Sequence, residues 1–488
     1  MTRSLLLIGG GVNGSIVEAV RHPALERVDY VELDPAILEL AREYFPDEWR
    51  MLQADPRVRV HVTDGRLFVK TTPSAFDVVI VNLPEPQNAQ LNRFYTTEFF
   101  REVWSRLTPT GVLSFQLRSS EDYISPELGQ YLRTIHKSLR AVFPDVTVIP
   151  GETVHFFAAR HTGILASGAA ELLARLRARN LRTSYVSEYF IPFRMMPDRM
   201  LDLETQIRPV PSTPTNRDFV PVAYYFDVAL WGSQFNQFYR RLFRGLAGIP
   251  FGSLLVAAGM LPAALAISGR FVKDRRRRLQ VAAGACTAAT GFTMIGLEIL
   301  LLLAFQAVFG YVYQQLAIVI AAFMAGMALG SWLSLRRPAT GDMRVLAMIQ
   351  MLVAAAPLVL LGLFAAMERA TGSLVLVASR AVFPGAALVS GLLGGFEFPL
   401  ASRISFRGTE PSAKTRLGSL YALDLAGSCL AAILFSTWFV PVFGFFRTAL
   451  LSATVSMVPA MTAILLVCGA DPEEEAPQPA GAHQRPAR

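Results

Sequence analysis

Hydrophobic and polar positions follow two different patterns along the chain, and the change falls near residue 220. Before that point, short apolar runs alternate with stretches whose apolar residues recur at helical spacing. We expect strands over 5–8, 28–31, 58–62, 76–81 and 111–117, and helices over 14–21, 35–44, 96–106, 124–143 and 169–180. Strands that alternate with helices predict a doubly wound, mostly parallel α/β sheet, which a hairpin over 146–149 and 154–158 closes.

Beyond residue 220 the apolar runs become long enough to cross a membrane. A spanning helix needs about 20 mostly apolar residues. The segments that meet this length are 249–268, 281–309, 312–335, 345–367, 374–401, 418–441 and 447–468. The sequence therefore predicts an all-α, multi-pass transmembrane domain of about seven helices over 249–470.

The other boundaries follow from composition. We assign 1–220 to the α/β domain and 471–488 to a disordered tail. Between the two domains, 221–248 carries aromatic residues and arginines, which suit a linker at a membrane interface.

Charge and cysteine content narrow the class of protein. The chain is 52% hydrophobic and 17% charged, and its formal net charge is +8. Because basic residues follow the first, third and fifth apolar segments, we interpret the charge as membrane topology, with those loops in the cytoplasm, and exclude nucleic-acid binding. The three cysteines lie in apolar segments, so no disulfide framework is indicated. No signal-peptide pattern precedes the first predicted strand.

The first apolar segment decides the side of the membrane on which the α/β domain lies. If 249–268 spans, the domain lies outside, whereas a re-entrant or interfacial segment leaves it in the cytoplasm. Pro250 and Pro262 make this segment the least regular candidate, and the arginines at 240, 241 and 244 favour a cytoplasmic side. We therefore expect a multi-pass cell-membrane protein with a cytoplasmic α/β domain.

A glycine-rich turn follows the first predicted strand. Gly9, Gly11 and Gly14 fit the spacing G-x-G-x-x-G between a strand and a helix, and Glu32 ends the second strand about 20 residues on. Glycines at such a turn let the backbone approach a nucleotide, and the carboxylate can accept hydrogen bonds from ribose hydroxyls. The alternative is a strand–helix turn that binds nothing.

Further polar residues follow the third and fourth strands. Asp64 comes directly after the third strand, and the loop from Asn82 to Glu85 follows the fourth. The carboxyl ends of parallel strands meet at one edge of the sheet, where ligands bind. An acid after the third strand is placed to accept from an adenine amino group, which favours an S-adenosylmethionine-type ligand over a nicotinamide one. The alternative for Asp64 is a turn-forming Asp-Gly pair.

These residues resemble the spermidine synthase (polyamine aminopropyltransferase) family over roughly residues 4–160. The likeness is carried by LLLIGGGVNGSIVEAV, VDYVELDPAILELAREYFP, DPRVRVHVTDGRLFV, FDVVIVNLPEP and LNRFYTTEFFREVWSRLTPTGVLSFQL. The resemblance implies a methyltransferase-like fold, decarboxylated S-adenosylmethionine as aminopropyl donor, a diamine such as putrescine as acceptor, and no metal.

The same resemblance implies roles for individual residues. Glu32 would hold the ribose, and Asp64 with Gly65 would contact the adenine. The loop that carries Asn82 and Glu85 would face the acceptor amine as the catalytic loop, and two further residues would lie near that amine, namely Tyr95 and Gln116.

The sequence departs from the family pattern at three places. The family has an Asp, which accepts the proton of the attacking amine, where this chain has Asn82, although Glu85 keeps a carboxylate three residues on. A general base is typically worth about 10²–10⁴-fold in rate. The family also has an Asp directly after the three glycines, where this chain has Val12 and then Asn13. The third departure is that a small β-domain precedes the family's glycine loop, so this chain either lost that domain or starts further upstream.

Three functions are therefore open. The first is a membrane-anchored aminopropyltransferase, with intact or degenerate chemistry, and the second is an inactive nucleotide-binding domain fused to a polyamine or cation transporter or sensor. The third is an S-adenosylmethionine-dependent methyltransferase. Each has a small-molecule partner and the lipid bilayer as its surroundings, and a homo-oligomer stays an open alternative.

Three carboxylates interrupt the apolar segments: Glu298, Glu397 and Asp424. A carboxylate is costly in lipid, so we expect each to face the bundle interior or a polar cavity, with Arg380 and Gln306 as candidate partners. The alternative is a buried polar group that only fixes packing. This half resembles the membrane module of fused spermidine synthase-like proteins through GFTMIGLEILLLLAFQAVFGYVY, FMAGMALGSW and GSLYALDLAGS.

Overall fold

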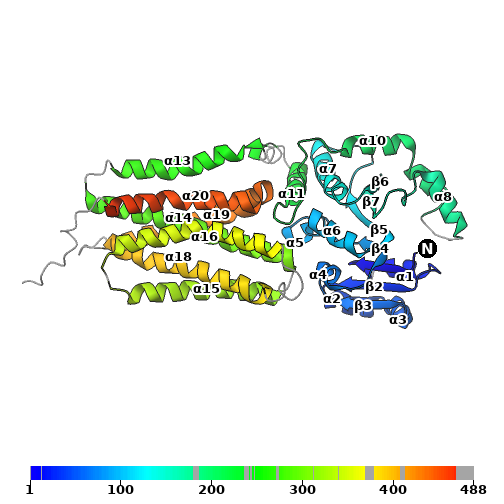
Figure 1. Cartoon of the computed structure of the whole chain (residues 1–488), viewed down its shortest axis with the longest axis horizontal. Coiled ribbons are helices and arrows are strands. Elements are labelled where there is room, and N and C mark those ends of the chain that lie inside the picture. The colour runs from blue at the N-terminus through cyan, green and yellow to red at the C-terminus, as the bar shows by residue number, and fades with distance from the viewer. Residues whose placement is uncertain are drawn as a thin grey trace, which may run out of the picture.

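The chain folds into an α/β domain and a helical bundle that lie end to end in the computed structural model (Figure 1). The structure describes residues 2–11, 14–121, 123–179, 186–235, 241, 245–246, 248–270, 274–310, 313–338, 340–368, 378–406 and 413–468. The predicted tail over 471–488 lies outside these residues.

A seven-stranded sheet forms the centre of the α/β domain. Its strands are β1 (Ser4–Ile8), β2 (Arg27–Glu32), β3 (Val58–Val62), β4 (Phe76–Val81), β5 (Leu107–Arg118), β6 (Asp145–Ile149) and β7 (Thr153–Ala159). They lie in the order β3-β2-β1-β4-β5-β7-β6, and only β7 runs antiparallel to its neighbours. This topology confirms the predicted doubly wound α/β class.

Helices cover both faces of this sheet. They are α1 (Ser15–Val20), α2 (Pro35–Tyr44), α3 (Pro46–Ala54), α4 (Gly65–Thr71), α5 (Ala89–Asn92), α6 (Thr97–Arg106), α7 (Pro126–Arg140), α8 (Ala169–Ala178), α9 (Phe190–Arg194), α10 (Pro197–Ile207) and α11 (Val222–Phe235). Strand β1 shows why both faces are needed: Leu6 and Ile8 belong to one core, and Leu5 and Leu7 belong to the other. Successive side chains of a strand point to opposite faces, so a continuous apolar run predicts a strand buried on both sides.

Side-chain caps fix where the helices begin. Asp34 accepts a hydrogen bond from the Ala36 N–H at the start of α2, and Asp64 accepts one from Leu67 N–H at the start of α4. Thr96 and Ser125 cap α6 and α7 in the same way. Such caps are typically worth about 1 kcal/mol each. Both Asp caps follow directly after a strand, so they place polar groups at the carboxyl edge of the sheet.

The first half of the predicted interfacial linker belongs to the α/β domain instead. Helix α11 packs against α7, and its Ala223 and Leu230 are buried in the core on that face of the sheet. Tyr225, expected at a membrane interface, is 3% exposed. The composition of 221–248 does not distinguish the two locations, because an apolar, aromatic helix face suits a protein core as well as a membrane interface.

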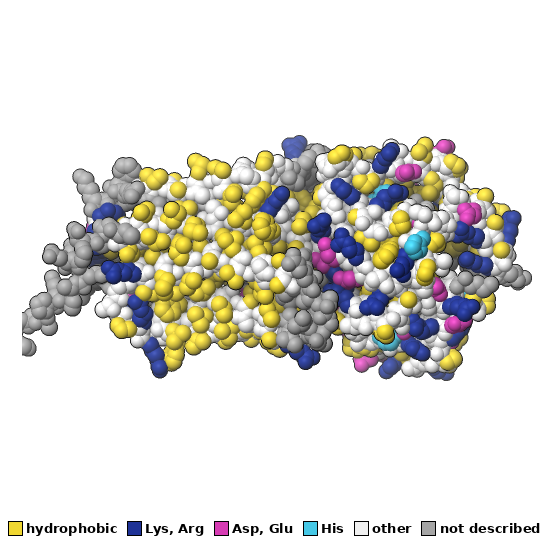
Figure 2. All heavy atoms as spheres, viewed as in Figure 1, with side chains coloured by type: hydrophobic (Ala, Val, Ile, Leu, Met, Phe, Trp, Pro, Cys, Tyr) yellow, Lys and Arg dark blue, Asp and Glu magenta, His cyan; other side chains and the backbone are white. Residues whose placement is uncertain are grey.

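The bundle follows as a set of long antiparallel helices. They are α13 (Phe251–Arg270), α14 (Arg275–Phe309), α15 (Tyr313–Arg336), α16 (Asp342–Glu368), the π-helical turn η2 (Ala378–Val382), α18 (Phe383–Phe406), α19 (Ala413–Leu434), the π-helical turn η3 (Phe435–Phe439) and α20 (Val440–Cys468). Five stretches in the described part are long and apolar enough to cross a membrane by length and composition, and the last of them contains both α19 and α20. Figure 2 shows apolar side chains over the bundle surface and mixed charges over the α/β domain.

Small residues let two bundle helices approach closely. A side chain at Gly326 or Gly330 of α15 would strike the α18 backbone at Leu388 and Leu392, and Gly391 and Gly395 of α18 lie as close to α15. Both pairs have the G-x-x-x-G spacing that allows such contact.

Candidate active site

Glycine conformation shapes the loop after β1. Gly9, Gly10 and Gly14 have φ values of 73°, 63° and 96°, a region that favours glycine. A side chain at Gly10 would strike the Asn82 side chain, so the loop after β4 lies directly against the glycine loop. Val12 and Asn13 lie outside the described residues. The effect of Val12, which stands where the family has an Asp, therefore stays a prediction.

Glu32 lies at the carboxyl end of β2 with three internal donors. The Tyr30 hydroxyl donates to Oε2 at 2.8 Å, and the N–H groups of Leu33 and Asp34 donate to Oε1 at 2.9 and 3.4 Å. Glu32 is 8% exposed. A carboxylate has about four acceptor positions. Oε2 accepts one hydrogen bond, from Tyr30, so it can accept a second from a donor such as a ribose hydroxyl.

Asp64 lies at the carboxyl end of β3, but it has a partner that the sequence did not predict. Its Oδ1 caps α4, and its Oδ2 accepts from the guanidinium of Arg93, at the end of α5. Both side chains are at most 5% exposed. The neighbouring Gly65 touches Ile8, since a side chain there would strike the Ile8 methyl. Their predicted adenine contacts stay predictions.

The bundle covers this part of the sheet edge. Gly310, directly after α14, has φ 87°, and a Cβ there would lie 2.5 Å from Asp64 Oδ2 and 2.6 Å from Arg93 Nη2. Gly444 in α20 makes an equally close approach to Phe219 and Val220, and the Phe445 N–H donates to the Phe219 carbonyl at 2.9 Å. Both glycines therefore lie where the bundle meets the α/β domain.

A buried arginine joins the two domains beside Asp64. Arg66 is 1% exposed and forms bidentate ion pairs with Glu102 and Asp218, with N–O distances of 2.6–2.8 Å. It also donates to the Ala307 carbonyl of α14 at 3.3 Å. Burial alone would lower the pKa of Arg66, but the carboxylates of Asp218 and Glu102 raise it well above its usual value. Lys70 donates to the Val308 carbonyl at 3.4 Å, so cations of the α/β domain meet the C-terminal carbonyls of α14, where the helix dipole favours them.

The loop after β4 is held in place from both sides. The Asn82 N–H donates to the Ile8 carbonyl at 2.9 Å. The Tyr95 hydroxyl donates to the carbonyls of Leu83 and Pro84 at 3.3 and 3.0 Å, and burial raises the pKa of Tyr95 well above its usual value. Tyr95 therefore positions this loop from beneath as a neutral phenol.

Glu85 is engaged by a residue at the end of β5. The Arg118 N–H donates to Oε1 at 2.6 Å, and Arg118 Nη2 donates to Oε2 at 2.9 Å. Gln116, predicted to lie near the acceptor amine, is exposed. The ring of its neighbour Phe115 contacts Tyr95, at 5.6 Å between centroids. The roles of Glu85 and Gln116 toward an acceptor stay predictions.

Asp227 of α11 joins this group and was missed as a site residue. Its Oδ1 lies 3.6 Å from Arg118 Nη2, and the side chain is 2% exposed. Burial, reinforced by the negative charge of Glu85 and opposed by Arg118, raises the pKa of Asp227 to about 6. Asp227 falls in the segment 221–248, whose composition we interpreted as that of an interfacial linker.

The bundle carboxylates lie in different surroundings. Glu397 is 1% exposed and accepts from the Thr290 hydroxyl at 2.5 Å, and the Gln350 amide group lies within 3.0 Å of its oxygens. Glu298 has no hydrogen-bond partner among the described residues, and the expected partner Arg380 is exposed. Asp424 is half-buried, and its backbone touches Gly291. Glu298 and Glu397 are therefore both buried in the bundle, and Glu397 has two polar side chains around it.

The strand order β3-β2-β1-β4-β5-β7-β6, with β7 antiparallel, defines a methyltransferase-like class of α/β domain. Residues 1–156 match the family described as the spermine/spermidine synthase domain. The predicted resemblance to this family is thus confirmed over residues 1–156.

Individual relatives agree with this assignment. A polyamine aminopropyltransferase from Nitrosomonas europaea is 32% identical over 148 residues, which cover 30% of this chain and 45% of that protein. Spermidine synthase 1 from Hyoscyamus niger is 33% identical over 158 residues, covering 32% and 50%. The chain spans about half the length of these relatives. A spermidine synthase structure from Thermotoga maritima aligns at 20% identity over 42% of this chain and 68% of that one, with a TM-score of 0.33.

Proposed function

We propose that the chain is a membrane-anchored aminopropyltransferase that moves an aminopropyl group from decarboxylated S-adenosylmethionine to a diamine such as putrescine. One observation carries the proposal. Within the residues that match the family, the glycine loop, Glu32, Asp64 and the loop from Asn82 to Glu85 all lie at one edge of the sheet.

The proposed roles follow from this edge. The glycine loop lies against the donor, Oε2 of Glu32 accepts from a ribose hydroxyl, and Asp64 with Gly65 contacts the adenine. The acceptor amine lies at the loop after β4. The α14 end with Gly310 covers Asp64, a position in which it excludes water from the donor.

The reaction requires a group that accepts a proton from the attacking amine. The neutral amine nitrogen forms a bond to the aminopropyl carbon, the carbon–sulfur bond breaks, and its electron pair converts the sulfonium into the thioether of methylthioadenosine. The nitrogen then gives up a proton. The Asn82 amide cannot take that proton, so the carboxylates left near this loop are Glu85 and Asp227.

The test is a turnover assay with the full chain in detergent micelles. We expect spermidine and methylthioadenosine to appear in equal amounts from the decarboxylated donor and putrescine, and Glu32→Gln to slow the reaction at low donor concentration. Methyl transfer from S-adenosylmethionine would assign the domain to a methyltransferase. A domain that binds donor but transfers nothing would be an inactive nucleotide-binding module.

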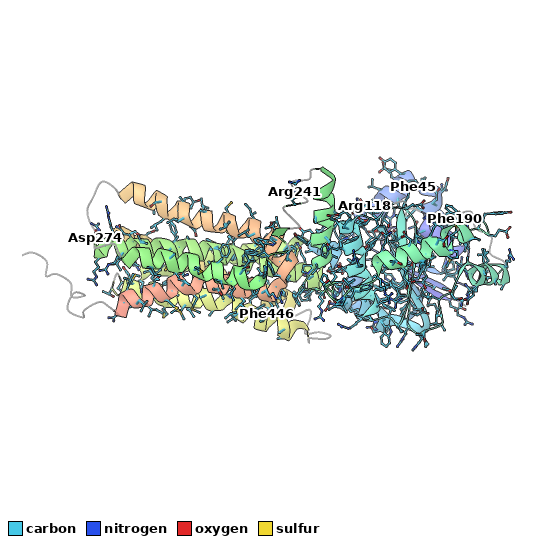
Figure 3. The ribbon with its side chains drawn as sticks, turned by 90° about the horizontal axis from the view of Figure 1, so that it is seen from above. Phe45, Arg118, Phe190, Arg241, Asp274 and Phe446 are labelled. Carbon is cyan, nitrogen blue, oxygen red and sulfur yellow. The ribbon has the colours of Figure 1, made fainter. Side chains whose placement is uncertain are left out.

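The ends of the bundle bear on its orientation in the membrane. Helix α13 is a continuous helix of 20 residues beside the other long helices (Figure 1), long enough to span about 30 Å. Arg403 pairs with Asp342 at 3.2 Å and donates to the Arg337 carbonyl at 3.0 Å. The basic ends of α15, α16 and α18 thus meet at the end that Figure 3 marks with Asp274, away from the α/β domain.

This arrangement bears directly on the expected cytoplasmic domain. Basic residues near membrane helices favour the cytoplasmic side, so the position of the basic end supports the opposite orientation, with the α/β domain on the other side of the membrane. The orientation does not enter the detergent assay, because the donor then reaches both ends of the protein.

The surroundings of Glu397 favour a second function for the bundle, the transport or sensing of a cation. A carboxylate that two polar side chains hold inside an apolar bundle is a functional-site candidate. Uptake of labelled putrescine into proteoliposomes tests it. We expect uptake that Glu397→Gln abolishes, and uptake unchanged in this variant would contradict the hypothesis.

A further inference from the structure

One carboxylate oxygen of Asp227 is buried and accepts no hydrogen bond from the described residues. The residue is 1% exposed, yet its Oδ1 has no hydrogen-bond partner among the described residues. The nearest cation among the described side chains, Arg118 Nη2, is 3.6 Å away, beyond hydrogen-bond distance. A buried acceptor of this kind is costly unless a partner satisfies it.

A second orphaned group lies on the helix that packs against α11. Tyr131 of α7 is 1% exposed, and its hydroxyl has no hydrogen-bond partner in the described part of the chain. Helices α7 and α11 pack together, and the charges of Asp227, Glu85 and Arg118 all act on the Tyr131 hydroxyl. The unpartnered Tyr131 hydroxyl is therefore subject to the same charges of Glu85 and Arg118 that act on Asp227.

The charges of the described members of this group do not balance. Glu85 lies 2.9 Å from Arg118 Nη2, and the same nitrogen is the nearest cation to Asp227. With both acids ionised, two carboxylates share one guanidinium, and one negative charge is left over. Among the described residues, Glu85 and Arg118 act on the carboxyl of Asp227, and Asp227 in turn acts on the hydroxyls of Tyr131 and Tyr224.

We propose that Asp227, Tyr131 and Glu85 form a subsite for a primary alkylammonium group, which is one end of the acceptor diamine. The inference rests on the proposed function and adds a carboxylate from α11, outside the residues that match the family. An ammonium has three donors and one positive charge. It satisfies Asp227 Oδ1 and the Tyr131 oxygen, and it supplies the missing charge.

The set of oxygens favours an ammonium over a metal ion. Ca²⁺ takes six to eight oxygen ligands and Mg²⁺ demands near-octahedral coordination, whereas this group offers three oxygen-bearing side chains beside a guanidinium. The more exposed members, Glu85 and Arg118, have side chains 15% and 34% exposed. Figure 3 places Arg118 on the side of the α/β domain that faces the bundle. The ammonium would enter past these two residues.

Protonation of Asp227 gives the subsite a pH dependence. Its pKa is about 6 because burial and Glu85 oppose ionisation, so the carboxyl is largely ionised at pH 7.5 and neutral at pH 5. An alkylammonium such as that of Lys has a pKa near 10 and stays charged over this range. Affinity for the amine therefore falls as the pH is lowered through about 6.

Calorimetric titration of putrescine into the full chain in detergent tests the subsite. We expect Asp227→Asn to weaken putrescine binding at least about tenfold at pH 7.5 and to flatten its dependence on pH. Tyr131→Phe removes only an unpartnered hydroxyl, so it should fold as the parent does and bind about threefold more weakly. Asp202→Asn, an exposed acid on α10, is the matched control and should bind as the parent does.

Donor binding, measured on the same samples, separates this inference from the proposed function. If the parent transfers aminopropyl groups while Asp227→Asn binds putrescine within twofold of the parent, the subsite is wrong and the function stands. If putrescine binding depends on Asp227 but no transfer occurs, the subsite is supported and the proposed function fails. If the parent does not bind putrescine, the subsite is overturned.

Discussion

Replacing Arg66 with methionine should destabilise the protein more than any exposed charge change in the same domain. The side chain is 1% exposed and holds Glu102 from α6, Asp218 from the segment before α11 and the Ala307 carbonyl of α14. Methionine fills much of the same volume but leaves two carboxylates facing each other without their shared cation. Lys70, 3.6 Å from Glu102, and the Thr96 hydroxyl, which donates to Asp218 at 2.7 Å, remain as partial compensation.

The expected magnitude follows from burial. Removing one partner of a buried ion pair typically costs about 3–5 kcal/mol. For a domain of this size, 1 kcal/mol shifts the melting temperature by about 2–4 °C, so Arg66→Met should lower it by roughly 6–20 °C. The matched control is Arg50→Met, which breaks an ion pair whose side chains are 74% and 83% exposed. Such surface pairs are worth at most about 1 kcal/mol.

The pH dependence of this loss has a definite sign. Burial and the neighbouring Asp218 raise the pKa of Glu98, and Arg66 partly opposes that rise. A carboxyl whose pKa is raised by folding contributes stability below its unfolded pKa, and that stability is lost as the pH rises through the folded pKa. Without Arg66 the pKa of Glu98 rises further, so the melting temperature of Arg66→Met should fall more between pH 5 and pH 8 than that of the parent.

The assay is thermal unfolding of the full chain in detergent, followed by tryptophan fluorescence. Combining Arg66→Met with Glu102→Gln and Asp218→Asn removes the uncompensated charges and should recover at least half of the loss. A shift for Arg66→Met no larger than that of Arg50→Met, or a triple variant as unstable as the single one, would refute the idea that this network fastens the domains together.

Three further predictions concern the site, the domain contact and the orientation. Asn82→Asp restores a carboxylate at the loop after β4, so it should raise turnover by at least about tenfold, within the range expected for a general base, which measurement of kcat checks. Gly310→Ala should lower the melting temperature by several degrees because its Cβ would strike Asp64, whereas Gly341→Ala, also at positive φ but in open space, should lower it less. In a cysteine-free background, a cysteine at Asp274 should be protected from an impermeant maleimide on intact cells, and one at Gln87 should be labelled.

A specific result would contradict each of these three predictions. Turnover of Asn82→Asp at or below that of the parent would show that this position does not receive the amine proton. Equal melting temperatures for the two glycine variants would contradict a tight contact between α14 and Asp64. Labelling of the cysteine at position 274 on intact cells, with protection at position 87, would place the α/β domain in the cytoplasm.

The order of strands and helices could be predicted because local patterns determine each element. The predicted strands over 58–62 and 76–81 and the helix over 35–44 have the bounds that the structure shows. Helices α3 and α4 were missed because their sequences are short and mixed in polarity. Helix α11 was placed at a membrane interface because an apolar aromatic face is ambiguous until its partner, α7, is known.

The sequence predicted those residues of the candidate site that lie at the carboxyl ends of strands, and no others. Glu32, Asp64 and Asn82 follow strands directly, so their shared edge was predictable from topology alone. Arg66, Arg93 and Asp227 were not, because their partners lie on distant segments: Ala307 is 241 residues from Arg66 in sequence. No periodicity in a sequence reports contacts of that kind.

Calorimetric titration of the purified full chain with decarboxylated S-adenosylmethionine, S-adenosylmethionine and methylthioadenosine tests the central claim most directly. The account predicts that the decarboxylated donor binds more tightly than S-adenosylmethionine and that Glu32→Gln weakens its binding. Tighter binding of S-adenosylmethionine, or no binding of any of the three, would contradict an aminopropyltransferase.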